Sequence, residues 1–446
     1  MTQQQVIANW GNYPQLSAEV DELGLLPDVQ NYLQQQSPLT LRGNGRSYGD
    51  ASLGKQVFST LKLNKFLDLN TESGILTCQG GVLLSEILDV ILPQGLFLPV
   101  TPGTKFITVG GAIASDVHGK NHHKEGSFSR HVLSFDLMLA DGTILTCSRQ
   151  ENQELFWLTM GGMGLTGLIL SATFLLKKIE TAYIRQTCIK ARNLAEIMDL
   201  FESSTDWTYS VAWIDCLATG EKQGRSLLLL GEHATLEDVS PNQKANPLEI
   251  PQKRKLNIPF YFPRFALNGL TVKAFNTLYY NKQWAKESQS LISYDPFFYP
   301  LDSIYNWNRI YGKPGFVQYQ FVLPKETSKD GLSEILTTIS QSGQGSFLAV
   351  LKLFGKGEPE AWLSFPMEGY TLALDFKVQP KVFELLEQLD RLVLKYGGRL
   401  YLTKDARMKK EALQNYPHLE QFKQSLPPGF TSHLAERLEL TINNKQ

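Results

Sequence analysis

The chain has 446 residues and a formal net charge of −1, so it carries no broad basic surface of the kind that binds nucleic acid. Its 42% hydrophobic and 20% charged content is typical of a soluble globular protein, and its length favours two domains over one core. The first ten residues lack a cationic start and an apolar run, and the longest apolar run, 164–176, is too short to span a bilayer. We therefore expect no signal peptide, no transmembrane segment, and a cytoplasmic or peripheral membrane location.

Four widely spaced cysteines (Cys78, Cys147, Cys188 and Cys216) predict reduced thiols rather than a disulfide framework or a metal site. His118, His122 and His123 could suggest a metal, but Gly119 disfavours a helix there and no acidic partner is suitably spaced. We expect no metal.

The first 180 residues predict strands and helices around glycine-rich loops. Strands are expected over 38–42, 56–63 and 74–78, followed by a helix from Leu84 that Pro93 ends. Residues 134–140 and 143–147 flank Asp141-Gly142 as a hairpin.

Two loops in this part could hold an anionic ligand. Gly43-Asn-Gly-Arg-Ser-Tyr-Gly49 follows a strand and offers consecutive backbone amides together with Arg46, which suits a pyrophosphate. The stretch 101–121 contains Gly103, Gly110 and Gly111, followed by a polar cluster around His118. A cofactor cradle and a tight turn with a solvated polar tail are both open for this stretch.

A third glycine motif, Gly162-Met-Gly-Leu-Thr-Gly167, matches the dinucleotide fingerprint G-x-G-x-x-G. That fingerprint requires a strand before it and a helix after it. Here 152–160 has a helical pattern and 168–176 a strand pattern, so the order is inverted and a Rossmann site is not expected.

Composition changes near 177–181, where we place a domain boundary. Beyond it we expect a helix through Leu194 and Phe201 and a buried strand at 226–231. Residues 236–262 are irregular, with Lys253-Arg-Lys255 among several prolines. They predict a solvated surface loop or, as the sharper alternative, a flap that touches a lipid or a partner.

Three further strands are expected at 315–324, 346–354 and 369–378. Alternation places Gln318 with Gln320 on one face of the first strand, and Thr371, Ala373 and Asp375 on one face of the third. Lys352 lies on one face of the second. These polar groups form either a pocket wall or a sheet face in contact with water.

The C-terminal part predicts a helix from Val382 to Tyr396, capped by Gly397-Gly398, and a strand over 399–405. Lys404 near the end of that strand is either solvated or paired with Asp405, or it is held near a developing negative charge. The residues alone do not decide between these roles.

Taken together, Leu41-Arg-Gly-Asn-Gly-Arg-Ser-Tyr-Gly-Asp50, the run 109–123 and Met160-Gly-Gly-Met-Gly-Leu-Thr-Gly167 resemble FAD-dependent oxidases of the vanillyl-alcohol-oxidase, PCMH-type family. Within it they resemble the decaprenylphosphoryl-β-D-ribose 2′-oxidases. Phe316–Phe321, Ser346–Gly355, Gly398–Asp405 and Arg437–Leu440 extend the resemblance, which covers about 41–440.

The resemblance implies an α+β, two-domain fold. Residues 1–182 and the returning segment 397–446 would form the FAD-binding domain, and 183–396 a substrate domain with a mainly antiparallel sheet. FAD would be bound by these residues: Arg42, Gly43, Asn44, Gly45, Arg46, Ser47, Tyr48, Pro102, Gly103, Thr104, Gly110, Gly111, Ala114, Ser115, Val117, Gly162, Gly167, Ile169, Tyr401 and Lys404.

The resemblance also implies hydride transfer from a ribose C2′ to flavin N5, the first half of an epimerisation that a short-chain reductase would complete. Lys404 would place positive charge near the flavin, and His118, or secondly Tyr48, would accept the hydroxyl proton. The substrate wall would comprise Lys120, Gln318, Gln320, Lys352, Thr371 and Ala373. Lys120 or Lys352 would hold the phosphate of a polyprenyl-phosphate sugar.

Three positions depart from the relatives. Arg46 stands where aldonolactone oxidases carry a histidine bonded to the flavin, so we predict non-covalent FAD. Ala373 replaces a cysteine attacked by nitro-aromatic inhibitors, and Thr371 replaces an asparagine. An aldonolactone oxidase acting on a small soluble substrate and a non-catalytic FAD-binding protein are the alternatives.

Overall fold

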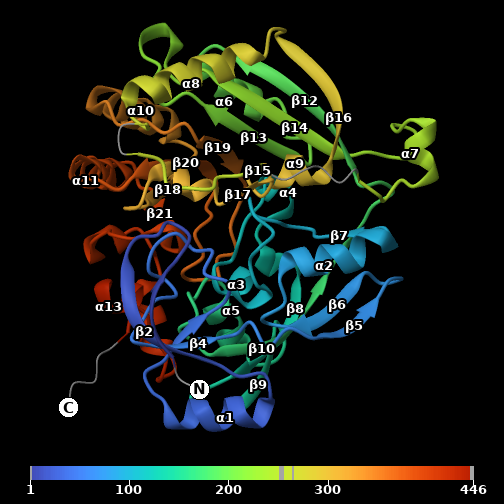
Figure 1. Cartoon of the computed structure of the whole chain (residues 1–446), viewed down its shortest axis with the longest axis vertical. Helices are drawn as coiled ribbons and strands as arrows, with labels where there is room; N and C mark the ends of the chain where they lie inside the picture. The colour runs from blue at the N-terminus through green and yellow to red at the C-terminus, as the bar shows by residue number, and fades with distance from the viewer. Residues whose placement is uncertain (1–2, 251–255, 264–265, 442–446) are drawn as a thin grey trace.

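The computed structural model describes residues 3–250, 256–263 and 266–441. The N-terminal third of the chain and its C-terminal segment share the lower part of the molecule, which contains both β2 (Gln15–Glu22) and α13 (His433–Arg437) (Figure 1). The middle of the chain forms the upper part around a large sheet (Figure 1). No helix in these described ranges is both long enough and apolar enough to cross a membrane.

A four-stranded sheet begins the lower part, in the order β1-β2-β4-β3. Its strands are β1 (Gln3–Ala8), β2, β4 (Gln56–Ser59) and β3 (Thr40–Arg42). The helix α1 (Leu26–Gln35) buries Val29 and Leu33 in the same cluster as Phe58. The parallel pair β3–β4 leaves the 43–49 loop at the carboxyl end of β3.

A five-stranded antiparallel sheet follows, in the order β5-β6-β10-β8-β9. Its strands are β5 (Phe66–Asn70), β6 (Ile75–Gln79), β10 (Leu168–Leu175), β8 (Val132–Met138) and β9 (Ile144–Ser148). The predicted hairpin at 141–142 is confirmed by the β8–β9 pairing. The helix α5 (Gln153–Thr159) precedes Gly162 and β10 follows Gly167, so the inverted order that argued against a Rossmann site is confirmed.

Shorter elements complete the lower part. They are α2 (Leu84–Ile91), η1 (Leu92–Gln94), β7 (Leu96–Phe97), α3 (Val109–Ala114), α4 (His122–Glu125), η2 (Phe128–His131), β11 (Lys177–Lys178), η6 (Lys410–Leu413), α12 (Leu419–Ser425) and α13. As predicted from its apolar spacing, α2 buries one face and ends just before Pro93.

The upper part is an eight-stranded antiparallel sheet in the order β16-β12-β14-β13-β19-β20-β18-β21. Its strands are β12 (Tyr183–Ala191), β13 (Tyr209–Ile214), β14 (Ser226–His233), β16 (Glu287–Ser293), β18 (Phe316–Pro324), β19 (Ala349–Phe354), β20 (Gly369–Lys377) and β21 (Arg399–Leu400). One face packs against α6 (Leu194–Glu202), α10 (Ser328–Ser342) and α11 (Pro380–Lys395). At one end of the opposite face lies α8 (Gly269–Lys282).

The remaining elements connect these layers. They are η3 (Gly220–Lys222), α7 (Pro241–Ala245), β15 (Leu256–Asn257), α9 (Tyr294–Phe298), β17 (Ile304–Tyr305), η4 (Trp307–Tyr311) and η5 (Leu402–Lys404). The segment 236–262 is largely irregular as predicted, but it contains α7 and pairs β15 with β17. Residues 251–255 of that segment lie outside the described residues.

Three strand predictions need correction. The strand expected over 56–63 ends at Ser59, and the chain then turns, with the Leu63 amide donating to the Thr60 carbonyl at 2.9 Å. The strand expected over 346–354 begins at Ala349, because Ser346 Oγ donates to the Leu348 carbonyl and accepts from the Asp375 amide and so holds a loop there. The strand expected over 399–405 ends at Leu400. The chain then tightens into η5, in which the Lys404 amide donates to the Tyr401 carbonyl at 3.0 Å, and this turn replaces a sheet ladder.

The four cysteines are buried and unpaired, which confirms the prediction of free thiols. Burial raises the pKa of the Cys78, Cys147 and Cys216 thiols to about 12. They are therefore protonated core residues with little nucleophilic character.

Candidate active site

The 43–49 loop presents backbone donors without partners. Within the described ranges, the amides of Asn44 to Ser47 donate no hydrogen bond. Gly43 lies against Thr108, since a Cβ at Gly43 would come within 2.3 Å of the Thr108 hydroxyl oxygen. Asn44 Nδ2 fixes the loop by donating to the Phe106 carbonyl at 2.8 Å. A run of free amides in a tight turn is a binding site for an anion such as a phosphate.

The stretch 101–117 lies directly beside that loop. The short helix α3 is capped by Thr108, whose hydroxyl accepts from the Gly111 amide at 3.1 Å, and the Gly110 amide donates to the Gly80 carbonyl at 2.7 Å. Pro102 precedes Gly103, where no atom lies within 4 Å of the position that a Cβ would take. This stretch therefore packs closely at α3 and leaves open space at Gly103.

The inverted glycine motif supports α3 from below. The Met163 amide donates to the Ala114 carbonyl at 2.8 Å, and the Gly161 amide donates to the Ile113 carbonyl at 3.0 Å. Gly162 and Gly167 lie in this supporting turn, while the carbonyl of Ile169 lies against Gly80. The motif thus positions the stretch that lines the cradle.

The returning C-terminal segment closes the site from the other side. Tyr401 Oη donates to the Ser115 carbonyl at 2.8 Å, and the Tyr48 amide donates to the Thr403 carbonyl at 3.1 Å. Lys404 Nζ lies 4.0 Å from the centre of the Tyr48 ring. The alternative that Lys404 pairs with Asp405 is wrong, because the Asp405 carboxylate accepts from Arg437 and from the amides of residues 407 and 408.

A buried ion-pair network fixes this junction. The Asp50 carboxylate is fully buried and accepts from Arg437 Nη2 at 2.8 Å and from His433 Nδ1 at 2.7 Å. Arg437 also donates to Asp405 at 2.8 Å. Burial opposes ionisation of Asp50, but the hydrogen bonds from His433 and Arg437 outweigh it and the pKa is lowered. The network joins the end of the 43–49 loop to the residue that follows Lys404.

The inner face of the eight-stranded sheet forms the opposite wall. Gln318 pairs with Asp375, Gln320 with Ala373 and Lys352 with Thr371 in the strand register. Because directly paired residues point to the same side of a sheet, all six side chains share one face. The structure therefore brings together the strand residues predicted for this wall. Gln320 of the wall donates to His118, so this face is not a sheet face in plain contact with water.

Three lysines face this space. Burial lowers the pKa of Lys120 and of Lys404 to about 7, and that of Lys352 to about 8. The charge of Lys352 further lowers the pKa of Lys120 and of Lys404. Lys120 Nζ donates to the Phe298 carbonyl at 3.2 Å. Lys352 Nζ has no hydrogen-bond or ion-pair partner in the described ranges. Three closely spaced, partly desolvated ammonium groups favour a strongly anionic ligand.

His118 is buried between the two walls, and its protonation follows from its contacts. Thr371 Oγ1 donates to the Phe321 carbonyl at 2.8 Å, so it accepts from Gln320 Nε2 at 3.2 Å. The same Gln320 amide group then donates to His118 Nε2 at 3.1 Å. Burial, followed by the nearby Lys352, holds the pKa of His118 well below its ordinary value. The neutral ring therefore carries its proton on Nδ1, which has no partner in the described structure.

Asp375 is a site residue that the sequence candidates left out. Its carboxylate accepts from Gln318 Nε2 at 2.6 Å and from Tyr311 Oη at 3.3 Å. Burial raises its pKa to about 7, and the Lys404 charge acts in the opposite direction. In the sequence, alternation places Asp375 on the same strand face as Thr371 and Ala373, which was the available signal for a site residue. The hydrogen-bond partners of Asp375 come from other segments, so the sequence of this strand alone could not identify them.

Tyr48 belongs to the same cluster. Its ring packs edge-on against Phe316 at 5.4 Å, and burial together with the Asp375 charge raises its pKa well above the ordinary value. The phenol is therefore a hydrogen-bond donor at neutral pH.

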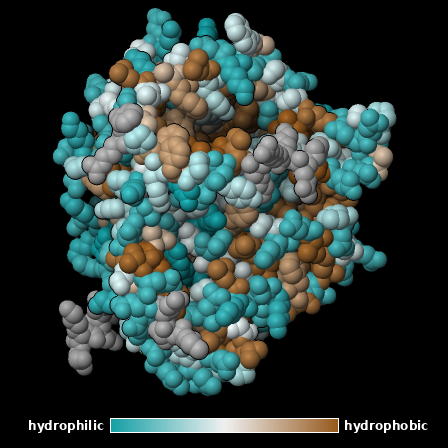
Figure 2. Space-filling view, viewed as in Figure 1, coloured by the Kyte–Doolittle hydropathy of each residue, from teal (hydrophilic) through white to brown (hydrophobic). Residues whose placement is uncertain are grey.

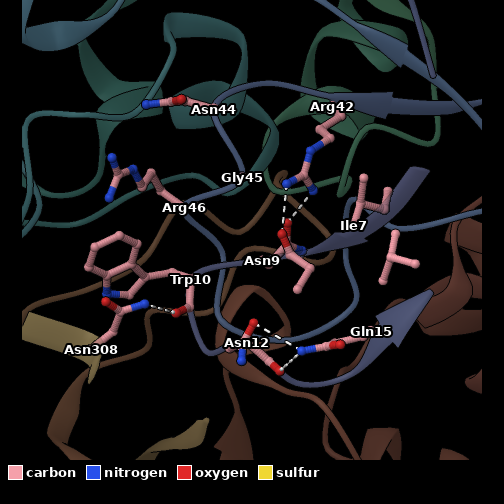
Figure 3. Close-up of a pocket in the computed structure, with 12 residues that line it drawn as sticks. Ile7, Asn9, Trp10, Asn12, Gln15, Arg42, Asn44, Gly45, Arg46 and Asn308 are labelled. Atoms are coloured by element: carbon pink, nitrogen blue, oxygen red, sulfur yellow. Dashed lines mark hydrogen bonds between the residues drawn. The ribbon is translucent and has the colours of Figure 1, made fainter. Parts of the chain in front are cut away.

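On the outer side of the 43–49 loop lies a polar cavity of about 400 Å³ (Figure 3). Arg42 is held inside it by the Asn9 side chain and by the Ala8 carbonyl, the latter at 2.8 Å. Arg46 instead lies over the Trp10 ring at 4.3 Å and has no hydrogen-bond partner in the described ranges. The Arg46 guanidinium therefore keeps its donors available for an anion beside the loop amides.

These features fit an extended, anionic cofactor. The free amides of the loop and the open space at Gly103 suit a pyrophosphate, and Tyr401 and Lys404 mark a place for an aromatic ring system. No group of three His, Cys, Asp or Glu side chains that could hold a metal occurs in the described part of the chain.

The comparisons with known proteins agree with this geometry. A model of the FAD binding domain matches residues 26–148. The chain is 38% identical over 413 residues to decaprenylphosphoryl-beta-D-ribose oxidase of Mycolicibacterium smegmatis, covering 90% of this chain and 88% of the relative. It is 33% identical to a Streptomyces coelicolor protein named "Uncharacterized protein in mprA 5'region", covering 80% of this chain and all of the relative. Mouse L-gulonolactone oxidase is 27% identical over 44% of this chain and 45% of its own length.

The chain belongs to the decaprenylphosphoryl-β-D-ribose oxidase family. It is an FAD-dependent oxidoreductase with a PCMH-type FAD-binding fold, and the lactone oxidases are distant relatives. The FAD model lies inside the part predicted to bind the cofactor, 1–182. The domain boundaries at 182 and 396 stay predictions.

Further contacts place other residues that were predicted to bind FAD. Thr104 donates to Asp302 at 3.1 Å, Val117 is buried behind α3, and Gly110 and Gly111 form the start of that helix. Asp302 comes from the middle of the chain, so it could not be found from the loop motifs.

Proposed function

We propose that the protein oxidises a secondary sugar hydroxyl, namely C2′ of a polyprenyl-phosphate-linked ribose, to the 2′-keto sugar. The observation that carries this proposal is the convergence of Lys120, Lys352 and Lys404 beside the cofactor cradle. The name of the Mycolicibacterium relative supports the choice of sugar. A short-chain reductase would return the keto sugar to the epimeric alcohol.

When bound, FAD supplies a hydride acceptor. In the proposed reaction, Lys404 holds positive charge at the end of the cradle between Tyr48 and Tyr401, where the acceptor becomes more negative. Lys120 and Lys352 bind the substrate phosphate, since both lie on the substrate side of the site and Lys352 has unused donors. Gln318 and Gln320 orient the sugar through hydrogen bonds.

His118 is our first candidate for the group that accepts the hydroxyl proton, and Tyr48 is the second. His118 is neutral, but its accepting Nε2 is hydrogen-bonded to Gln320, so Gln320 must turn away before Nε2 takes a proton. Tyr48 is less suited because its raised pKa keeps the phenol protonated. If His118→Ala reduces its flavin anaerobically at the wild-type rate, His118 does not accept this proton.

The proposed reaction is tested by mixing the oxidised holoenzyme with polyprenyl-phosphate ribose without oxygen and following the flavin absorbance. We expect bleaching and formation of the 2′-keto product. L-gulonolactone is the comparison substrate: bleaching by the lactone alone would favour an aldonolactone oxidase. No bleaching by any sugar alcohol would favour a non-catalytic FAD-binding protein.

The FAD is proposed to be dissociable, because Arg46 occupies the position of the flavin-linked histidine in the lactone oxidases. Acid precipitation should release yellow FAD into the supernatant. Yellow colour retained in the washed pellet would show a covalent bond and refute the proposal.

A further inference from the structure

The helix α8 exposes large apolar side chains to solvent. Leu270 and Leu278, eight positions apart, are 81% and 74% exposed, and Trp284 just beyond the helix is 93% exposed. Ala274 lies between the two leucines at i+4 spacing, so the three form one outward row. In Figure 1, α8 lies at the top of the molecule, at the edge opposite α1. Figure 2 shows apolar residues scattered among hydrophilic ones over the upper part of this face.

This outward row is not needed to hold the helix in place. The opposite side of α8 is anchored by Asn276, which donates to Asp215 at 2.8 Å, and by Tyr280, which donates to the Ala191 carbonyl at 3.1 Å. Tyr279 packs on Trp213 of β13 with the ring centres 4.8 Å apart. The helix therefore has one apolar side for the sheet and a second apolar side without a partner in the described structure.

The helix and the residues that lead into and out of it carry charge of a single sign. Between Leu256 and Lys286 the sequence contains no Asp or Glu, and the first acidic residue is Glu287. Lys273 and Lys282 of α8 are exposed and form no ion pair in the described ranges. Exposed leucines and a tryptophan flanked by unpaired lysines are typical of a helix that lies in the interface of an anionic bilayer.

We propose that α8 and Trp284 form a docking surface for an anionic lipid bilayer. In this arrangement the leucines and the indole enter the boundary between headgroups and acyl chains, and the lysines meet the anionic headgroups. The sequence placed lipid contact in 236–262 as an alternative, where Leu256 and Phe260 are also exposed, and the proposal adds α8, the next helix along the chain, to that contact.

The helix that carries this row packs on the same sheet as the active site. Trp213, which contacts the inner side of α8, pairs with Val350, and Lys352 follows two residues later on the same sheet face. Docking through α8 therefore attaches the sheet that carries the proposed phosphate-binding lysine to the surface of the membrane.

The proposal is tested with the FAD-loaded full chain and sedimenting vesicles of phosphatidylcholine alone or mixed equally with phosphatidylglycerol. We expect binding to the anionic vesicles that weakens with added salt. The variant Leu270→Ser/Leu278→Ser/Trp284→Ser should bind at least about tenfold more weakly, because it loses the inserted apolar area. Lys273→Glu/Lys282→Glu should lose the preference for anionic vesicles.

A matched control carries Leu25→Ser, Leu67→Ser and Ile144→Ser, which are also exposed but lie in the lower part of the molecule. It should bind like the wild type, and flavin absorbance and thermal unfolding show that each variant is folded. Failure of the wild type to bind, or equal loss in the control, would overturn the proposal. Concentration-dependent dimers that the triple variant abolishes, without vesicle binding, would assign the surface to a second copy of the chain. Because the vesicles contain no sugar substrate, these outcomes are independent of the proposed reaction.

Discussion

The 43–49 loop and the inner face of the eight-stranded sheet border the same site, but they contribute to it through different parts of the chain. The loop offers backbone amides, and its glycines are packed so closely that a Cβ would collide with Thr108 or with the Asp405 carbonyl. The sheet offers side chains: Lys352, Gln318 and Asp375 project from three different strands. A backbone site fails when a side chain is added, whereas a side-chain site fails when a charge or a hydrogen bond is removed.

The largest effect is expected for Gly49→Ala. Its Cβ would lie 1.6 Å from the Asp405 carbonyl oxygen, so the loop and the C-terminal segment must separate. We expect a loss of about 4 kcal/mol or more in the free energy of unfolding and protein purified without FAD. Urea unfolding measures the loss of stability, and the ratio of flavin to protein absorbance measures the loss of FAD.

Gly103→Ala is the matched comparison, because no atom lies within 4 Å of its Cβ position. Its apo form should unfold like the wild type, and a weakened FAD affinity would show that the cofactor occupies the open space. If Gly49→Ala and Gly103→Ala lowered the free energy of unfolding equally, the proposed difference between a closely packed glycine and an open one would be contradicted.

The next effect is expected for Arg437→Ala, which removes the arginine partner of the buried Asp50 carboxylate. His433 still donates to this carboxylate, but breaking a buried ion pair by removing one partner costs about 3 kcal/mol or more, so the free energy of unfolding should fall by that order. Arg437→Lys should recover part of it. The flavin spectrum should also change, since Asp405 loses the contact that fixes the segment of Lys404. A flavin spectrum like that of the wild type, together with reduced stability, would show that Arg437 stabilises the fold without positioning Lys404.

A smaller effect, on binding rather than stability, is expected on the sheet side. Lys352→Met should raise KM for a phosphate-linked sugar by about tenfold to a hundredfold, in keeping with the loss of one charged hydrogen bond, and leave the FAD content unchanged. Because the pKa of Lys352 is lowered to about 8, wild-type KM should increase as pH rises from 7 to 9. Lys352→Arg keeps its charge over this range and should flatten that increase. An unchanged KM in the methionine variant would remove Lys352 from phosphate binding.

The smallest effect is expected for His433, which is partly exposed. Its hydrogen bond to Asp50 raises the pKa of His433 above the ordinary value of 6.5. A raised pKa means that the stabilisation is complete below pH 6.5 and is lost as pH rises through the folded-state value. His433→Gln should therefore cost less than about 1 kcal/mol at pH 6 and almost nothing at pH 9. A cost that grows with pH would have the wrong sign for this ion pair.

The two sides of the site also differed in how far the sequence could predict them. The loop was recognisable because its three glycines lie within seven residues of the sequence and because backbone contacts restrict which residues fit. Alternation assigned Lys352 and Gln320 to sheet faces, but only the strand register shows that these faces are one. Asp375, Tyr311 and Asp302 come from separate segments, so nothing local marks them as neighbours.

The predictions that failed also concern segments whose structure depends on contacts with distant parts of the chain. The segment 399–405 has the composition of a strand, yet β18 pairs with only two of its residues before contacts with Tyr48 and Ser115 turn the chain. Tertiary contacts overrode the local pattern. The N-terminal strands β1 and β2 were not predicted, since their exposed glutamines and glutamates give no continuous apolar face.

The network of Asp50 with His433 and Arg437 also sets an order of events during synthesis. Residues 43–50 leave the ribosome early, but the groups that neutralise Asp50 and the carbonyl that holds the Tyr48 amide follow more than three hundred residues later. The nascent chain therefore carries an incomplete cradle until almost its whole described length has emerged. Cofactor loading is consequently expected to be a late step, and a chain that ends before Arg437 should not retain FAD.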